Sequence, residues 1–306
     1  MKQVDWKAAE LAELGRLVRA LVQDSSRGPN TLTRQSIASP GAVSIEWRHS
    51  GRFLGTAWLV APSQLSALAQ IIDRARPSLQ AANELLLCLA YTPRTVALGD
   101  DHDWQQLTAN LRRGLEAYEL EMSGQPQTVK FVNPFAIVAQ NRPIERQLLH
   151  YAQQYGFTLP QARAGQLMVR VYDTQQFFID LYRSKAAAVP LYRTQEIVPL
   201  STINRSQIER LRNLWGEYLI RSVQADGRMS YLFYPSRGTE DLQRNNAIRQ
   251  WMATRALIAW WRETQSEQVL VILRRNLDYN LRAMYREEGN LGLIRDGEKI
   301  KLAQSS

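Results

Sequence analysis

Cysteine and histidine are scarce in this chain of 306 residues. The single cysteine, Cys88, excludes an internal disulfide framework. Its place inside the apolar stretch ELLLCLAYT is typical of a packed thiol rather than a nucleophile. The three histidines, His49, His102 and His150, lie far apart and form no metal-ligand spacing with cysteines or carboxylates. The sequence therefore predicts no metal site, and we expect no cofactor.

The glycine-rich and serine-centred motifs of several large enzyme classes are also missing. The chain has no Gly-x-x-x-x-Gly-Lys-Ser/Thr and no Gly-x-Gly-x-x-Gly after a strand. It has no Gly-x-Ser-x-Gly nucleophile elbow. These absences exclude the P-loop, dinucleotide-binding and α/β-hydrolase patterns.

Long hydrophobic runs are absent. No stretch reaches the roughly 18 to 20 apolar residues that a membrane-spanning helix needs. The N-terminal stretch MKQVDWKAAELAELGRLVRALVQ is amphipathic and carries acidic residues, so it lacks the apolar core of a signal peptide. The sequence predicts a soluble, cytoplasmic protein.

The composition is that of a globular protein, with 45% hydrophobic and 22% charged residues. The length suffices for two ordinary domains. A net charge of +9 and a pI near 9.8 favour anionic partners: nucleic acid, a membrane surface or an acidic glycan. No stretch contains five or more like charges in a row, so the alternative is that the basic residues are dispersed over solvated faces.

The first 132 residues predict a mixed α+β domain. Residues 5–23 have the apolar spacing of a helix, and AVSIEWRHSGRFLGTAWLV has the alternation and turn of a β-hairpin. Residues 63–76 predict a second helix. LLLCLAY and RTVAL read as separate strands, and GLEAYELEM with TVKFV predicts a second hairpin.

Residues 133–200 are expected to form a connecting region. A helix follows the Asn-Arg-Pro stop, and QLMVRVYDTQQFFIDLYRS predicts a third hairpin that turns at Asp173-Thr174. The prolines at 190 and 199 favour edge strands or a linker.

Residues 201–306 predict an α-helical hairpin domain. Ile208, Leu211, Trp215 and Leu219 are in helical register, with Asn204 or Ser206 as the cap. Helices are expected over 243–263 and 267–286 as an antiparallel pair, followed by a Gly-rich turn and the start of another helix. The fold class is therefore α+β: a mixed N-terminal domain with β-hairpins, then an antiparallel helical region.

The C-terminal third resembles the first hairpins of the (α/α) toroid proteins of the six-hairpin glycosidase-like superfamily. In those proteins an Asp-Gly-x-x-x-Tyr-x-Tyr segment precedes an Asn-x-x-Arg at the start of an inner helix. Those places are occupied here by Asp226, Gly227, Tyr231, Tyr234, Asn246 and Arg249. The resemblance implies an incomplete toroid and a carbohydrate-active or carbohydrate-binding protein, and it leads us to expect that the chain is a fragment.

A saccharide-binding rim is the site that this resemblance implies. Aromatic rings stack on sugar faces, while Arg and Asn donate directional hydrogen bonds to hydroxyls and carboxylates. The candidate residues are Asp226, Tyr231, Tyr234, Arg237, Asn246, Arg249 and Trp251. Each also has a structural interpretation. Trp251 is at a core spacing, Asn246 or its neighbour Asn245 fits a helix cap, and Arg249 fits an ion pair with Glu240 or Asp241.

No catalytic residue is assigned. Glycoside hydrolysis needs two carboxylates about 5 to 10 Å apart. The carboxylates near the rim are Asp226, Glu240 and Asp241, and nothing in the sequence marks one of them as an acid or base.

The N-terminal part resembles a divergent AMMECR1-type domain. That family carries a Gly-x-Leu-Arg-Gly-Cys-Ile-Gly segment at the first hairpin, where this chain has Arg52-Phe53-Leu54-Gly55-Thr56-Ala57-Trp58. The Arg and Cys of the motif are absent, which puts any function tied to them in doubt. The resemblance implies a fold and little about activity.

Two alternatives to a saccharide-related role remain open, and enzyme status is not decided. One is a non-enzymatic polyanion binder, which needs its basic residues on one face. The residues concerned are Arg112, Arg113, Lys130, Arg142, Arg146, Arg163, Arg170 and Arg183. The other is a protein-interaction module whose exposed helical face is rich in Trp and Arg. The expected ligand is a saccharide or another anion, with nucleic acid less favoured, and the sequence makes no prediction of oligomeric state.

Overall fold

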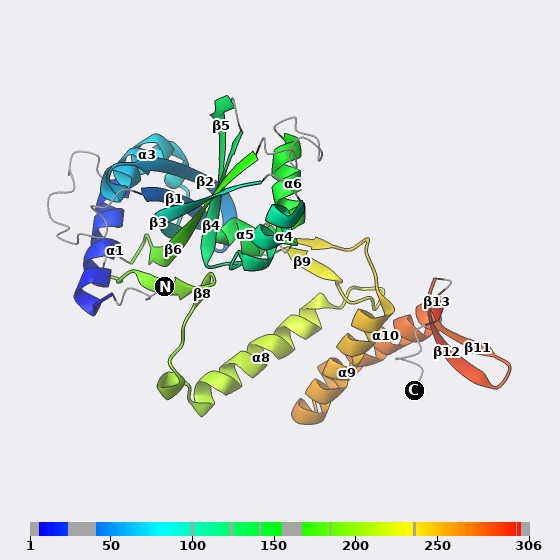
Figure 1. Ribbon diagram of the computed structural model, residues 1–306. Coiled ribbons are helices and arrows are strands. Elements are labelled where there is room, and N and C mark those ends of the chain that lie inside the picture. The colour runs from blue at the N-terminus through cyan, green and yellow to red at the C-terminus, as the bar shows by residue number, and fades with distance from the viewer. Residues whose placement is uncertain are drawn as a thin grey trace. The chain divides into compact units, whose positions relative to one another are not determined.

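The chain forms two compact units, residues 1–197 and 198–306. The computed structural model describes residues 6–23, 41–98, 101–122, 125–140, 142–154, 167–183, 185–234, 237–297 and 299–300. Figure 1 colours the chain from its N-terminus to its C-terminus.

An antiparallel sheet forms the centre of the first unit. Its main path runs β2-β1-β3-β6-β4-β5, and the short β7 and β8 extend from β6. The strands are β1 (Gly41–His49), β2 (Arg52–Ala61), β3 (Glu84–Ala97), β4 (Glu116–Met122), β5 (Gln125–Val132), β6 (Leu167–Asp180), β7 (Val189–Tyr192) and β8 (Gln195–Glu196). The predicted first hairpin is therefore confirmed as β1–β2, and the second as β4–β5.

Two helices cover the part of the sheet that contains β1. Helix α1 (Ala8–Gln23) and helix α3 (Gln64–Leu79) bury Leu14, Leu68 and Ile72 against inward residues of β1, β3 and β6. Ser63 caps α3 by accepting from the backbone N–H of Ser66 at 3.5 Å. The apolar stripes predicted for residues 5–23 and 63–76 are thus the faces that pack on the sheet.

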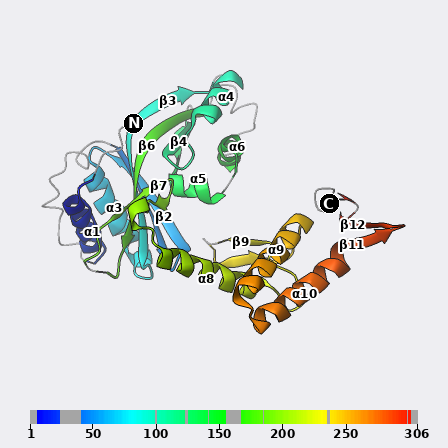
Figure 2. The same ribbon diagram turned by 90° about the horizontal axis from the view of Figure 1, so that it is seen from below.

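Three further helices pack on the part of the sheet that contains β4. They are α4 (Asp101–Asn110), α5 (Pro134–Gln140) and α6 (Ile144–Gln154). Trp104, Ile137 and Leu148 form a second apolar cluster with Tyr118 of β4 and Val169 of β6. Figure 2 shows α1 and α3 on one side of the long strands β3 and β6, with α5 and α6 on the other. Along β6, Val171 belongs to this second cluster and Phe177 to the first, and the polar residues 173–176 lie between them.

The third hairpin predicted at Asp173-Thr174 is wrong, because β6 runs unbroken from Leu167 to Asp180. The polar residues suggested a turn, but their side chains have partners from elsewhere in the chain. Thr174 Oγ1 donates to the carbonyl of Leu115 at 2.7 Å, and Gln176 Nε2 donates to that of Gly114 at 2.9 Å. The two strands expected at LLLCLAY and RTVAL are likewise one strand, β3, with an irregularity between Tyr91 and Arg94.

Glu46 on β1 is a buried carboxylate whose ionisation opposes folding. Burial raises the pKa of Glu46, although the Arg48 guanidinium, which donates from Nε at 2.7 Å, acts in the opposite direction. Because the pKa of this carboxyl is higher in the folded state than in the unfolded state, protonation favours the folded state. The stability gained this way is fully present below the pKa of the unfolded state, and it is lost as the pH rises through the pKa of the folded state.

We expect the variant Glu46→Gln to gain thermal stability relative to the wild type as the pH rises from about 4 to about 7. Melting curves across that range measure the difference. The substitution Glu217→Gln, which removes one carboxylate from an exposed position, serves as the control. A difference between Glu46→Gln and wild type that is constant with pH would contradict the prediction.

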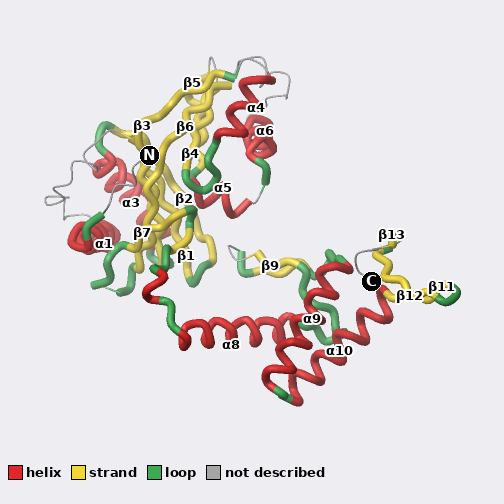
Figure 3. The backbone as a smooth tube through the Cα atoms, turned by 60° about the horizontal axis from the view of Figure 1, so that its bottom comes forward, coloured by secondary structure: helices red, strands yellow, loops and turns green. Residues whose placement is uncertain are grey.

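The second unit is mainly helical. After a 3-10 turn, Leu200–Thr202, it contains α8 (Arg205–Ser222), α9 (Ala247–Thr264) and α10 (Glu267–Met284). Its short strands are β9 (Leu232–Tyr234), β10 (Thr239–Asp241), β11 (Tyr285–Glu288), β12 (Leu291–Asp296) and β13 (Lys299–Ile300). Figure 3 shows α9 beside α10, with the β11–β12 hairpin continuing from the end of α10. The expected antiparallel pair α9–α10 is confirmed.

A buried polar network fixes the loop between α8 and β9 onto α9 and α10. Asn276 Nδ2 donates to the carbonyl of Gly227 at 2.8 Å, and Thr254 Oγ1 donates to Asn276 Oδ1 at 2.6 Å. Gln250 both accepts from the backbone N–H of Met229 and donates to its carbonyl, at 3.0 and 2.8 Å. All three side chains belong to residues with at most 2% exposure, so each lost partner leaves an unsatisfied polar group.

The mixed α+β class is confirmed: an antiparallel sheet with helices is followed by a helical pair. The start of another helix, expected at the end of the chain in KLAQSS, lies outside the described residues. The described residues before it form β12 and β13. Gly289, with φ of +61°, makes the turn of the β11–β12 hairpin, and Ile294 buries against Ala247 and Met284. The incomplete toroid remains a prediction.

Candidate functional site

The residues predicted as a saccharide rim fall on separate elements of the second unit. Asp226 is exposed in the loop after α8, where its Oδ1 accepts from the backbone N–H of Arg228 at 2.9 Å. Tyr231 lies just before β9 and is half-buried. Tyr234 ends β9 and lies next to the exposed Arg237. Asp226 thus has a local structural role that needs no ligand.

Tyr234 and Arg237 are the two rim residues that interact directly through their side chains. The Arg237 guanidinium carbon lies 5.6 Å from the centre of the Tyr234 ring. This cation–π contact occupies one face of the ring, so a saccharide stacking on that face would have to displace the guanidinium. The pair therefore gives the saccharide hypothesis weak physical support.

The remaining rim residues sit at the start of α9. Asn246 caps the helix by accepting from the backbone N–H of Arg249 at 3.3 Å, and the Arg249 side chain is exposed. Trp251 packs with Ala247 and Met284. Asp241, one of the two acids considered as a partner for Arg249, instead pairs with Arg244 at 3.3 Å. A saccharide-binding rim stays a prediction.

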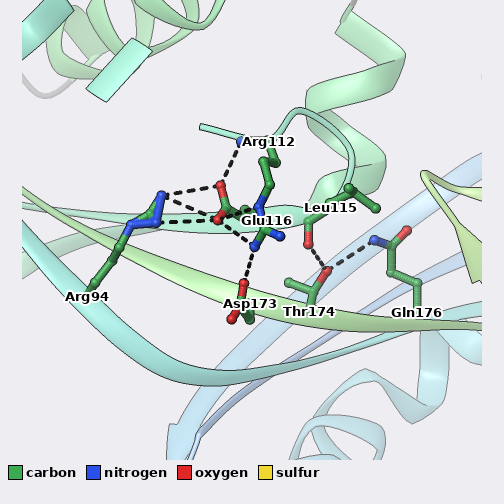
Figure 4. Close-up of polar contacts among 7 residues, drawn as sticks. All are labelled: Arg94, Arg112, Leu115, Glu116, Asp173, Thr174 and Gln176. Atoms are coloured by element: carbon green, nitrogen blue, oxygen red, sulfur yellow. Dashed lines mark hydrogen bonds and ion pairs between the residues drawn. The ribbon is translucent and has the colours of Figure 1, made fainter. Parts of the chain in front are cut away.

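A polar cluster at the centre of the sheet in the first unit is the densest set of charges that sequence reasoning missed. Figure 4 shows Glu116 of β4 between two guanidinium groups. Arg94 of β3 donates to both Glu116 carboxylate oxygens at 3.4 Å. Arg112 donates its backbone N–H at 2.7 Å and its Nε at 3.1 Å, and its Nη2 also contacts Asp173.

This cluster has the character of a structural ion-pair network. The Glu116 side chain is 2% exposed, whereas those of Arg94 and Arg112 are 48% and 44% exposed. Two cations face two carboxylates, so the cluster has no excess charge to attract an anion. Cys88, the one thiol in the chain, is buried on β3, and burial raises its pKa to about 12, so it is a poor nucleophile.

Several of the basic residues considered for polyanion binding are already paired with acids. Arg112 contacts Glu116 and Asp173, Arg170 contacts Glu119 and Glu121, and Arg183 lies 3.5 Å from Asp180. Arg163 lies outside the described residues. Within the described ranges, no three His, Cys, Asp or Glu residues gather as a set of metal ligands.

The clearest candidate for a binding surface is one face of α8. Ile208, Leu211 and Trp215 recur at i, i+3 and i+7, and Leu214 and Tyr218 lie beside them. Their exposed fractions are 57%, 57% and 65%, then 47% and 39%. We call these five residues the α8 stripe. The sequence predicts the helical register of Ile208, Leu211 and Trp215 but not that this face is left uncovered.

Another face of α8 holds the helix in its unit. Leu219 and Val223 pack into the cluster of Met229, Leu257 and Leu273. Gly216 allows close contact with α9, because a Cβ there would lie 2.2 Å from the Trp260 ring. Asn204 forms a capping box with Gln207, which fixes the first turn. The α8 stripe is therefore presented on a well-anchored helix.

Arginines border the α8 stripe. Arg210 precedes Leu214 by four residues, and Arg221 follows it by seven. Both arginines therefore lie on the side of the stripe that contains Leu214. Both are exposed, and neither pairs with an acid within the described part of the chain. Arg212, by contrast, donates to Glu263 of α9 at 2.7 Å. The exposed Glu217 lies on the same border, four residues before Arg221, so this border carries two arginines and one acid and has a net positive charge.

Comparison with known proteins gives a likeness of fold without a function. No protein-family model and no curated protein matches the chain. Among solved structures, it is similar to uncharacterized protein PH0010 from Pyrococcus horikoshii, with 11% identity and a TM-score of 0.47. The match covers 60% of this chain and 98% of that one. No family is assigned on this basis, and the AMMECR1-type resemblance remains a resemblance. No helix within the described residues is both long and apolar enough to cross a membrane.

Proposed function

We propose that this chain is a protein-interaction module in which the α8 stripe binds an amphipathic, acid-bordered helix of another protein. The observation that supports the proposal is the exposure of Ile208, Leu211, Leu214 and Trp215, each between 47% and 65%, on one helical face. Large contiguous apolar surface of this kind marks an interaction site more often than scattered single residues do.

Covering the stripe would contribute hydrophobic free energy in proportion to the exposed part of each side chain. Fully burying one Leu, Ile or Phe side chain contributes about 1.5–3 kcal/mol, and several such side chains lie together here. Trp215 and Tyr218 are in edge-to-face contact, with ring centroids 6.2 Å apart. A Trp with a supporting aromatic neighbour is the kind of residue that dominates the energy of an interface.

The shape of the stripe favours a helix as the partner. Its residues follow one helical face over about three turns. Such a face is covered most efficiently by another helix with the matching i, i+3, i+7 spacing. Arg210 and Arg221 on the border select for Glu or Asp on the partner. A second copy that paired through its own α8 stripe would bring arginine against arginine at this border and is disfavoured.

Two designed peptides test the proposal with the full chain. Both carry the same apolar face on a helix, but one is bordered by Glu and the other by Lys. We expect the Glu-bordered peptide to bind, as measured by calorimetry, and Trp215→Ala to weaken that binding at least tenfold. Met252→Ala is the matched control, because Met252 is a 60% exposed apolar residue on α9 outside the stripe.

Three results would overturn the proposal. They are no binding of the Glu-bordered peptide, equal binding of both peptides, or the same loss from Met252→Ala as from Trp215→Ala. The expected charge selectivity also predicts that binding weakens as salt is raised, since Arg210 and Arg221 are exposed.

A further inference from the structure

Strand β2 is an outer strand of the sheet in the first unit. β1 is its partner on one side, and no described residue pairs with its other edge. Most of its residues are exposed or half-buried, including Phe53, Leu54 and Val60 at 42%, 39% and 47% exposure. An outer strand presents a row of unpaired backbone N–H and C=O groups.

The opposite outer strand carries features that block further pairing, and β2 lacks most of them. β5 contains Pro126 and Lys130, and the β4–β5 pairing shifts register between Glu121 and Met122. β7, beside β6, has four residues and includes Pro190. Proline, lysine and irregularity are devices that keep sheet edges from associating. β2 has no proline, and its one charged residue is Arg52 at its first position.

The usable part of β2 is regular. The β1–β2 register changes between Trp47 and Arg48, which leaves Leu54 as the extra residue of a bulge beside the turn. From Gly55 to Ala61 the pairing with β1 is continuous. These seven residues form an edge that another strand can extend.

We propose that the β2 edge pairs antiparallel with the β2 edge of a second copy of this chain, with the two-fold axis at Trp58. Antiparallel pairing of a strand with itself is self-complementary, so one two-fold axis satisfies both copies. Around Trp58, residue 56 of each copy lies opposite residue 60 of the other. The seven-residue pair would form about six to eight backbone hydrogen bonds, two at every second facing pair.

The side chains agree with this register. Thr56 and Val60 are exposed, β-branched residues on one face of the strand, and β-branched pairs are favourable directly across a sheet. Trp58 is half-buried, and its ring stacks on Phe131 at 5.6 Å between centroids, which holds it beside the axis. Arg52 of each copy lies beyond the paired segment, at opposite ends. The uncharged β2 edge therefore accepts a second copy, in contrast to the arginine-bordered α8 stripe.

Two double variants test the pairing by charge. Thr56→Lys with Val60→Lys places lysine opposite lysine on both sides of the axis, and Thr56→Lys with Val60→Glu places lysine opposite glutamate. Both double variants lose the hydrogen bond that Thr56 Oγ1 donates to the Ile45 carbonyl, so this loss cannot account for a difference between them. Far-UV circular dichroism and a melting curve confirm that each variant is folded.

We expect light scattering to give the wild type twice the chain mass of 35.1 kDa at high concentration. The Lys/Lys variant should be a monomer, and the Lys/Glu variant a dimer whose dissociation increases with salt. A wild-type monomer, or a dimer that survives in the Lys/Lys variant, overturns the proposal.

Loss of the dimer in both variants overturns the pairing centred on Trp58. A second measurement does not depend on any substitution. Backbone amides within Gly55–Ala61 should exchange hydrogen more slowly as the wild-type concentration rises, and rates that ignore concentration overturn the proposal.

Discussion

Substitution of Gly227 by alanine is expected to unfold much of the second unit. Gly227 has φ of +94°, and a Cβ at this position would lie 2.3 Å from the backbone carbonyl oxygen of Arg275 in α10. Backbone atoms of a helix cannot move aside as a flexible side chain can. The loop must therefore lift from α10, which also breaks the bond from Asn276 to the Gly227 carbonyl. We expect a loss of about 3–5 kcal/mol in stability, among the largest for a single substitution.

Gly238→Ala separates the steric effect from the conformational one. Gly238, in the turn between β9 and β10, also has a positive φ of +62°, but nothing lies within 4 Å of the position that an alanine methyl group would take. Alanine there should cost about 1 kcal/mol, the penalty of the left-handed conformation alone. Hydrogen exchange of the α9 and α10 amides reports on this unit directly. Equal effects of the two substitutions would show that the loop is not held against α10 as described.

Local signals in the sequence predict the elements that depend on local interactions. Asn204 and Asn246 are predictable as caps because a capping side chain acts within three residues of its own position. The β1–β2 hairpin follows from its alternation and its Ser50-Gly51 turn, where both residues have positive φ. The helix pair α9–α10 follows from apolar period and a short connection.

The errors concern residues whose partners are distant in the sequence. Asp173 and Thr174 suggest a turn from the local sequence, but the bonds that place this stretch within β6 are distant. Thr174 and Gln176 donate to the carbonyls of Leu115 and Gly114, at separations of 59 and 62 residues. The α8 stripe is a similar case. Its period predicts a helix, whereas which face is covered depends on tertiary neighbours. Glu116 has no visible partner in the sequence beyond Arg112, since Arg94 reaches it only through strand pairing.

Removal of the Glu116 carboxylate is expected to destabilise the first unit strongly. Glu116 accepts hydrogen bonds from both Arg94 and Arg112, including the Arg112 backbone N–H at 2.7 Å. Glu116→Ala leaves that N–H without its acceptor and removes the anion between two cations. The guanidinium groups are about half exposed and regain water, which reduces the penalty below that of a fully buried pair. We expect a loss of about 2–4 kcal/mol, measured by urea unfolding.

Comparison with Asp173→Ala shows whether the stability lost in Glu116→Ala comes from the burial of Glu116 or from the change in net charge. Asp173 contacts the same Arg112 guanidinium, but its side chain is 36% exposed, so its contribution is screened by solvent. We expect a loss of about 0.5–1 kcal/mol from this variant. Both substitutions remove one negative charge, so an explanation based on net charge predicts equal effects. If Asp173→Ala proved as costly as Glu116→Ala, the ion pair between Arg112 and Asp173 would outweigh the buried hydrogen bonds that we assign to Glu116.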